Sequence, residues 1–219
     1  INFNWRIYYP AAPDVHASVR VHSVAVFRCP SDVRGPGETA DGLFGIGIDD
    51  GAEEHDHGSE GEGHAEEEHG YHPVDGPEMG VLCELAKANY VGNFGARVEL
   101  DESPAAGDGV FFRNSRIGFV QLTDGSTKTL LAGERSSRLG CSTWAGVIPG
   151  AEALRARVVA AGDHPPNSGD HFADYSSAHP GGANFIMGDA AVQFLTDGID
   201  EGVFQALCTR SGGEGGGVP

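Results

Sequence analysis

The fold is decided by HPGGANFIMGDAAVQFLTDGID, residues 179–200. Two apolar runs, 183–187 and 191–195, are separated by a three-residue segment that contains glycine. Such a pair of runs is typical of a β-hairpin with a short loop. Asp189 lies at the predicted tip, where a carboxylate accepts backbone N–H groups and fixes the turn. A short amphipathic helix is predicted within 199–207, with Asp197 or Asp200 as its cap.

The residues just before the hairpin shape the approach to its first strand. His179 can form hydrogen bonds through both ring nitrogens, and Pro180 stiffens the backbone. Gly181 and Gly182 let the chain turn sharply into the strand. These residue types favour a structural latch at His179 over a metal ligand.

The rest of the chain contains further short strand-like runs and many turn residues. The sequence has 34 glycines and 12 prolines, which fits a turn-rich β or α+β domain better than a helix bundle. We predict an α+β fold, a β-rich head with an antiparallel sheet, as one domain over 1–211 with a flexible glycine-rich tail at 212–219. The runs predict strands at 3–9, 19–27, 89–95, 129–133, 143–148 and 155–161, and a short helix at 82–88.

Residues 49–72 differ sharply in composition from their surroundings. They contain ten carboxylates and five histidines, with no lysine or arginine. Such a segment cannot bury enough apolar surface to offset its ordering entropy, so we expect an exposed insertion loop. Its carboxylates suit calcium and its imidazoles suit zinc or copper, but the pattern favours a solvated acidic loop over a specific metal site. The candidate metal ligands are His55, His57, His64, His69 and His72.

The overall charge excludes one class of partner and favours another. The formal net charge is −18, with only 14 lysines and arginines. Nucleic-acid binding needs clustered basic residues, so nucleic acid is not an expected partner, whereas divalent cations are. No apolar run reaches the 18 to 20 residues or so that a membrane-spanning helix needs, so we expect no membrane span in the sequence given.

Four cysteines are spread along the chain at Cys29, Cys83, Cys141 and Cys208. None forms the close CxxC pair of a zinc ribbon or a thioredoxin-like site. Two disulfides and four buried thiols are both consistent with this spacing. Of the three possible pairings we favour Cys29 with Cys83 and Cys141 with Cys208.

Catalytic motifs are not evident in the sequence. The GxSxG motif of serine hydrolases does not occur. The presence of both serines and histidines is no evidence of a catalytic triad, because a chain with ten histidines offers such combinations by chance. Asp163-His164 and Asp170-His171 could line a metal or ligand pocket with His179, or could serve as loop residues that hydrogen-bond the backbone.

The segment 176–200 also resembles the C-terminal signature of a large bacterial pilin-like (pseudopilin) family of unknown function, whose hallmark is a histidine followed after nine residues by Asp-Gly. His179 and Asp189 have this spacing. Other segments similar to the family lie, in family order, at 27–32, 89–95, 108–112, 123–130 and 133–135.

The resemblance implies an exported protein similar to subunits of type IV pili and type II secretion pseudopilins, located at the cell surface, outside the cell or in the periplasm. It implies that the cysteines form disulfides and that the partners are other protein subunits. It implies no enzymatic activity and no required cofactor. The family's apolar prepilin helix would precede Ile1, so we expect a processed or partial chain. The predicted function is an extracytoplasmic structural or interaction protein, with a metal-binding module built on 49–72 as the alternative.

One position departs from the family pattern. Ala190 follows Asp189 where the family has glycine. A positive φ angle would strain an alanine by about 1 kcal/mol or more. We therefore predict a different turn type at this hairpin, with Ala190 outside the positive-φ region.

Overall fold

A computed structural model of the chain describes residues 17–47, 81–96, 100, 103–138, 140–146, 157–169 and 173–213. The elements in chain order are α1 (Ala17–Arg20), η1 (Ala25–Phe27), β1 (Leu43–Gly47), β2 (Val81–Ala88), β3 (Tyr90–Gly95), η2 (Phe119–Gln121), η3 (Ser126–Lys128), β4 (Leu130–Glu134), β5 (Ser142–Thr143), β6 (Val159–Ala161), β7 (Gly182–Met187), β8 (Val192–Thr196) and α2 (Glu201–Cys208). The fold is α+β and β-rich with few helices, as the sequence predicted, but one of its sheets is mixed, whereas only an antiparallel sheet was expected.

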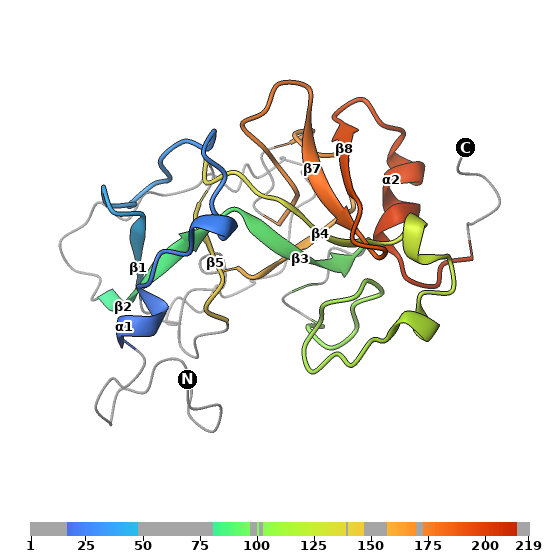
Figure 1. The fold of residues 1–219 in the computed structure, drawn as a ribbon, viewed down its shortest axis with the longest axis horizontal. Helices are drawn as coiled ribbons and strands as arrows, with labels where there is room; N and C mark the ends of the chain where they lie inside the picture. Colours follow the sequence, from blue (N-terminus) through green and yellow to red (C-terminus); the bar gives the residue numbers. More distant parts are fainter. Residues whose placement is uncertain are drawn as a thin grey trace, which may run out of the picture.

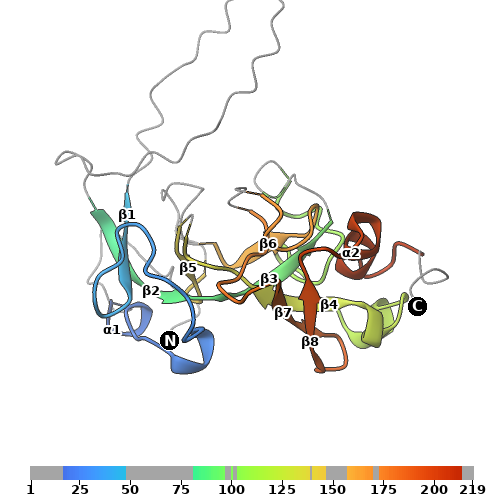
Figure 2. The same cartoon turned by 90° about the horizontal axis from the view of Figure 1, so that it is seen from above.

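The strands form two sheets that are joined by one nearly continuous segment. One sheet has the order β1-β2-β5 and the other β6-β3-β4-β7-β8. Only Asn89 separates β2 from β3, and the two strands run from one sheet into the other (Figures 1 and 2). The pairs are antiparallel except for β3 with β6, which is parallel.

The five-stranded sheet packs against α2 through aromatic side chains. Tyr175, Phe185 and Phe204 meet edge to face, with ring centroids 5.1 to 6.1 Å apart. Asp200 caps α2 by accepting a hydrogen bond from the N–H of Val203 at 3.1 Å. The predicted hairpin and C-terminal helix are both present in the structure.

The helix predicted at 82–88 is wrong, because these residues form β2. Their helix propensity is overridden by antiparallel pairing with β1 along most of the strand and with β5 at Lys87 and Ala88. Cys83 and Leu85 point into a second apolar cluster, whereas Glu84 between them is exposed. The strand predicted at 19–27 is also wrong: this segment forms the end of α1, a turn and η1.

The predicted disulfides are not found. All four cysteines are buried and none is joined to another. Cys141 belongs to the apolar cluster of the three-stranded sheet and Cys208 to that of the five-stranded sheet. The predicted partners Cys141 and Cys208 therefore lie in different cores. Cys83 lies in the same core as Cys141, whereas the Cys29 thiol faces His179.

The turn prediction at Ala190 is also wrong. Ala190 has a φ of 68°, the left-handed conformation in which glycine is favoured. Its N–H donates to the carbonyl of Met187 at 2.9 Å, and the N–H of Met187 donates to the carbonyl of Ala191 at 2.8 Å. This is a three-residue hairpin loop in which a turn is followed by a left-handed residue, and the family's glycine matches that requirement.

Three predictions concern residues that the structure does not describe. The strand at 3–9, the insertion at 49–72 and most of the tail at 212–219 lie outside the described ranges. Within those ranges, no helix has the length and apolar character needed to cross a bilayer.

Candidate functional site

His179 lies where three segments far apart in the sequence meet. Its Nε2 atom is 3.4 Å from Sγ of Cys29 and 3.3 Å from Oε1 of Glu134, the last residue of β4. The backbone N–H of His179 donates to the hydroxyl of Ser177 at 3.0 Å. The imidazole thus connects the loop before the C-terminal hairpin to the centre of the sheet and to the N-terminal part of the fold.

Glu134 is the centre of this cluster, with a side chain that is 2% exposed. Its Oε2 accepts hydrogen bonds from the backbone N–H of Asn184 at 2.7 Å, from the Asn184 side-chain amide at 3.1 Å and from the Ser177 hydroxyl at 3.1 Å. The Tyr90 hydroxyl donates to Oε1 at 3.4 Å. A buried carboxylate needs such donors, so Glu134 fixes the hairpin against β4.

The cluster is not arranged as a nucleophilic centre. Burial, together with the nearby charges of Glu134 and Asp32, raises the pKa of the Cys29 thiol. A reactive cysteine needs a lowered pKa, because the thiolate is the nucleophile. Burial and the Glu134 charge also raise the pKa of Tyr90 to about 12. Sγ, Nε2 and a Glu134 oxygen lie within 4.8 Å of one another, so they could share a metal ion.

A second polar network, centred on Asp32, lies beside this cluster. Asp32 accepts hydrogen bonds from the Ser136 hydroxyl at 2.8 Å and from the Asn89 amide at 2.6 Å, and it pairs with Nζ of Lys87 at 3.0 Å. Burial acts to raise the pKa of Asp32, but the hydrogen bonds from Ser137, Ser136 and Lys87 outweigh it, and the net shift is downward. Asp32 is therefore held as a buried anion at the junction of β2 and β3.

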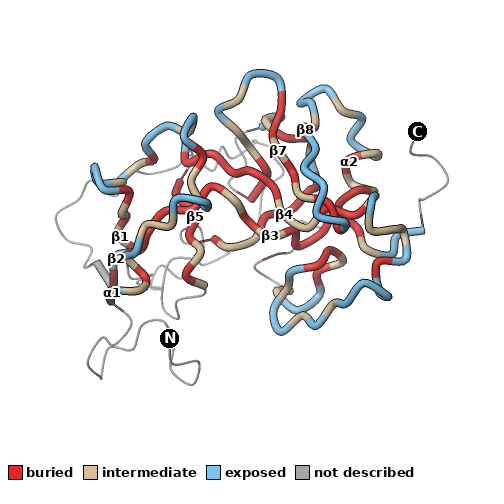
Figure 3. The backbone as a smooth tube through the Cα atoms, viewed as in Figure 1, coloured by how far each residue is buried: buried red, intermediate tan, exposed pale blue. Residues whose placement is uncertain are grey.

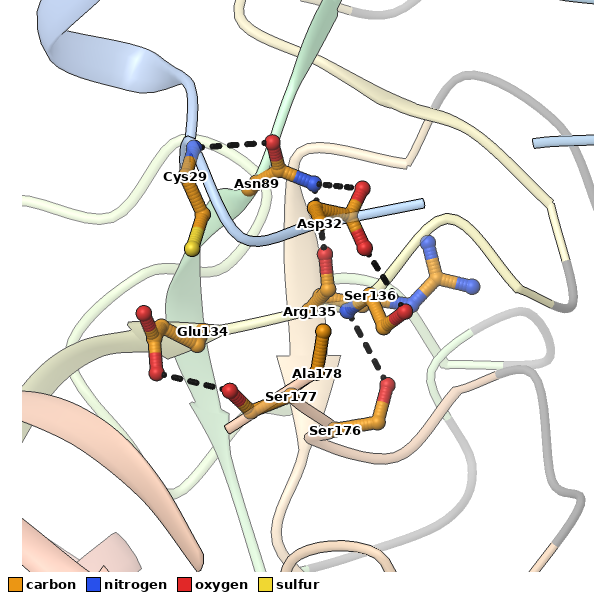
Figure 4. A pocket seen from close by; sticks show the side chains of 9 residues that line it. All are labelled: Cys29, Asp32, Asn89, Glu134, Arg135, Ser136, Ser176, Ser177 and Ala178. Carbon is orange, nitrogen blue, oxygen red and sulfur yellow. Dashed lines mark hydrogen bonds between the residues drawn. The ribbon is translucent and has the colours of Figure 1, made fainter. Parts of the chain in front are cut away.

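A small recess opens between the two networks (Figure 4). Its empty volume is about 140 Å³. Pockets for organic ligands usually begin at roughly 300 Å³, so this recess is too small for such a substrate. The lining residues are Cys29, Asp32, Asn89, Glu134, Arg135, Ser136, Ser176, Ser177 and Ala178.

A separate cluster forms between the end of β6 and the segment before the hairpin. Nδ1 of His164 is 3.0 Å from Oδ2 of Asp163 and 3.4 Å from Oδ2 of Asp174. Both carboxylates are buried, whereas the His164 side chain is 49% exposed. Burial and the adjacent Asp163 raise the pKa of Asp174 to about 8, against the opposing charge of Arg135.

The predicted site residues fall into three groups. His55, His57, His64, His69 and His72 lie outside the described residues. His179 is grouped with Cys29 and Glu134, whereas Asp163 and His164 are grouped with Asp174, so the suggested common pocket divides into two clusters. The suggested partners Asp170 and His171 are not described.

The remaining signature residues have local explanations. Gly181 has a φ of 81°, and a side chain on Gly182 would overlap the carbonyl oxygen of Leu195 on β8. Asp189 accepts a hydrogen bond from the N–H of Ala191 at 3.0 Å. The path of the backbone thus accounts for Gly181 and Gly182, and Asp189 stabilises the turn.

Sequence reasoning did not single out Cys29, Glu134 or Asp174 as neighbours of histidines. A signal was present at Glu134, because a carboxylate that directly follows the apolar strand 129–133 must be paired if it is buried. The contacts with Cys29 and Asp174 depend on tertiary pairing and leave no local pattern.

No curated protein and no solved structure matches this chain. The sequence model of one family, described as proteins of unknown function (DUF1559), matches residues 1–202. This match covers most of the chain, which therefore belongs to the DUF1559 family.

Proposed function

We propose that this chain is the pilin-like head of an exported subunit and works by packing against other protein subunits of a surface or secretion assembly. The resemblance of residues 176–200 to pilin-like proteins supports this proposal, and so does the small size of the recess beside His179. The proposal includes no catalysis and places the protein outside the cytoplasm.

The observation that carries the proposal is strand β8. It forms one edge of the five-stranded sheet and, among the described residues, pairs only with β7. Every residue of β8 except Leu195 is exposed, including Val192 at 68% and Phe194 at 48% (Figure 3).

An apolar edge strand is a ready surface for another chain. Natural sheets usually protect an edge with charged residues, proline or a bulge. The β8 sequence VQFLT contains no charged residue and no proline. The register between β8 and β7 is continuous, so β8 has no bulge. A neighbouring subunit could cover Val192 and Phe194 and could pair with the open backbone of the strand.

Self-association tests this proposal most directly. We expect sedimentation of the purified chain to show association that increases with concentration, and expect Val192→Lys to weaken it by about tenfold or more, because it places a charge in the contact. Val120→Lys is the matched control, since Val120 is 93% exposed on η2. A wild-type chain that stays monomeric at high concentration, or equal effects of both variants, would contradict the proposal.

The proposed location has its own test. Fractionation of cells that express the full-length gene product should place it in the periplasmic or surface fraction. Recovery from the cytoplasm alone would be inconsistent with an exported subunit.

Metal binding by residues 49–72 is a second candidate function. It is favoured by the five histidines and ten carboxylates of that segment. Titration calorimetry should then detect zinc, copper or calcium binding that is lost when 49–72 is deleted. Unchanged binding after the deletion would exclude the segment as the site.

A further inference from the structure

The cluster of Asp163, His164 and Asp174 contains buried carboxylate oxygens that the described protein does not satisfy. Asp163 and Asp174 are 7% and 5% exposed. Neither oxygen of Asp174 accepts a hydrogen bond, and the same holds for Oδ1 of Asp163. Buried carboxylates are normally hydrogen-bonded, paired or bound to a metal, so this arrangement indicates an additional positive species.

Glu134 provides the contrast within the same molecule. Its two oxygens accept hydrogen bonds from Tyr90, Ser177 and Asn184, so that carboxylate is already satisfied by the protein. The Cys29 cluster therefore does not require a metal. The Asp163 cluster differs because three of its four carboxylate oxygens accept no hydrogen bond, and only Oδ2 of Asp163 has His164 at 3.0 Å.

The backbone holds the two carboxylates firmly in place. Asp174 forms a parallel bridge with Ala161 at the end of β6, and the N–H of Ala161 donates to the carbonyl of Ala173 at 3.0 Å. The side chain of Gln205 on α2 donates to the carbonyl of Asp163 at 2.7 Å. Ligands fixed in this way lose little conformational entropy when they bind an ion.

We propose that Asp163, His164 and Asp174 form a binding site for a divalent transition-metal ion, with zinc as the best match. The ligands would be one oxygen from each carboxylate and Nδ1 of His164. These three atoms lie within 4.8 Å of one another.

The separations between the candidate ligand atoms fit a tetrahedral ion. Ligand atoms about 2.1 Å from a tetrahedral zinc lie about 3.4 Å from one another. Nδ1 of His164 is 3.0 Å and 3.4 Å from the two Oδ2 atoms. Only small adjustments are needed to admit the ion.

The ligand types select the class of ion. Calcium takes six to eight oxygen ligands, whereas an imidazole with two carboxylates suits zinc and its neighbours. The His164 side chain is 49% exposed, so solvent reaches one of the three candidate ligands. The nearby charge of Arg135 opposes cation binding but does not neutralise two carboxylates.

Zinc titration of the full chain, freed of metal by a chelator, tests this site. Asp174→Asn should lose one zinc equivalent relative to the wild type, while Asp197→Asn, which removes the same charge from an exposed position, should lose none. Because the 49–72 segment is the same in all variants, any ions that it binds cancel in the comparison.

Thermal unfolding gives a second readout. Zinc at about 100 times its dissociation constant should raise the melting temperature of the wild type on the order of 5 to 10 °C more than that of Asp174→Asn. Calcium at the same concentration should give no such difference. If calcium raised the melting temperature of the wild type above that of Asp174→Asn by as much as zinc does, the assignment to a transition metal would be overturned.

If Asp174→Asn does not fold, His164→Ala provides the test instead. The side chain of His164 is half exposed, so replacing it leaves the core intact. This variant should bind the site's zinc at least about tenfold more weakly. Wild-type stoichiometry and affinity in both folded variants would show that a shared proton, and not a metal ion, occupies the pair of carboxylates.

Discussion

Ala190 holds a left-handed backbone angle that glycine would adopt with less strain. Its φ is 68°, and such a conformation costs a residue with a β-carbon roughly 1 to 2 kcal/mol. We expect Ala190→Gly to raise the free energy of unfolding by about 0.5 to 1 kcal/mol, since glycine's greater freedom in the unfolded chain offsets part of the gain. Urea unfolding measures this change.

The adjacent Ala191 supplies the control for this prediction. It is also exposed but does not have a positive φ. Ala191→Gly should therefore lower stability by about 0.5 to 1 kcal/mol. Equal losses in the two glycine variants would mean that the angle at Ala190 is not a source of strain.

The four cysteines should behave as unreactive buried thiols. Burial raises the pKa of Cys141 to about 12 and that of Cys208 well above its ordinary value, so few thiolates exist at neutral pH. We expect a thiol reagent to label the native protein slowly and to label four thiols at once in denaturant without reductant. Two or fewer labelled thiols would reveal a disulfide.

Among the elements, β7 and β8 pack so closely at Gly182 that no side chain fits there. A β-carbon at this position would overlap the Leu195 carbonyl oxygen, which belongs to the backbone and cannot rotate away. We expect Gly182→Ala to destabilise the fold by about 2 kcal/mol or more, because the strands must separate or shift.

Gly198, just after β8, is the matched control. A β-carbon added to Gly198 would have no other atom within 4 Å, and this glycine does not have a positive φ. Gly198→Ala should change the free energy of unfolding by no more than about 0.5 kcal/mol. If Gly182→Ala proves equally mild in urea unfolding, the close approach of β8 is not required.

The elements also show where sequence reasoning succeeds. The C-terminal hairpin and α2 were predictable because their signals are local: two apolar runs separated by a short glycine-containing loop, and an aspartate cap. Strand β2 was not predictable, since Glu84 and Lys87 favour helices and only the pairing of β2 with β1 and β5 makes this segment extended. The same limit applies to the sites, because the contacts of His179 with Cys29 and of Asp163 with Asp174 arise only after the strands have assembled.

At the scale of the whole molecule, Asp32 joins the parts of the fold that meet between the two sheets. It binds Asn89 at the junction of β2 and β3, Ser136 just after β4, and Lys87 on β2. The side chains of Asp32 and Lys87 are only 2% and 3% exposed, and Lys87 also pairs with Glu38 at 2.9 Å. Removing one member leaves buried charge poorly compensated, so this network should govern the acid stability of the fold.

The pH dependence of Asp32→Asn follows from the lowered pKa of the folded carboxyl group. A pKa lower than in the unfolded chain means that the ionised group stabilises the fold above about pH 4, and that this contribution is lost as the pH falls through the lower, folded value. We expect Asp32→Asn to cost about 3 kcal/mol at pH 7, because the amide cannot neutralise Lys87 and presents N–H groups to the donors of Ser136 and Ser137. The difference between the wild type and the variant should shrink as the pH falls below 4.

Urea unfolding from pH 3 to pH 7 measures this difference in the free energy of unfolding, with the exposed Asp41→Asn as the control for loss of charge. A difference that stays constant over this range would show that the ionised form of Asp32 does not hold the two sheets together.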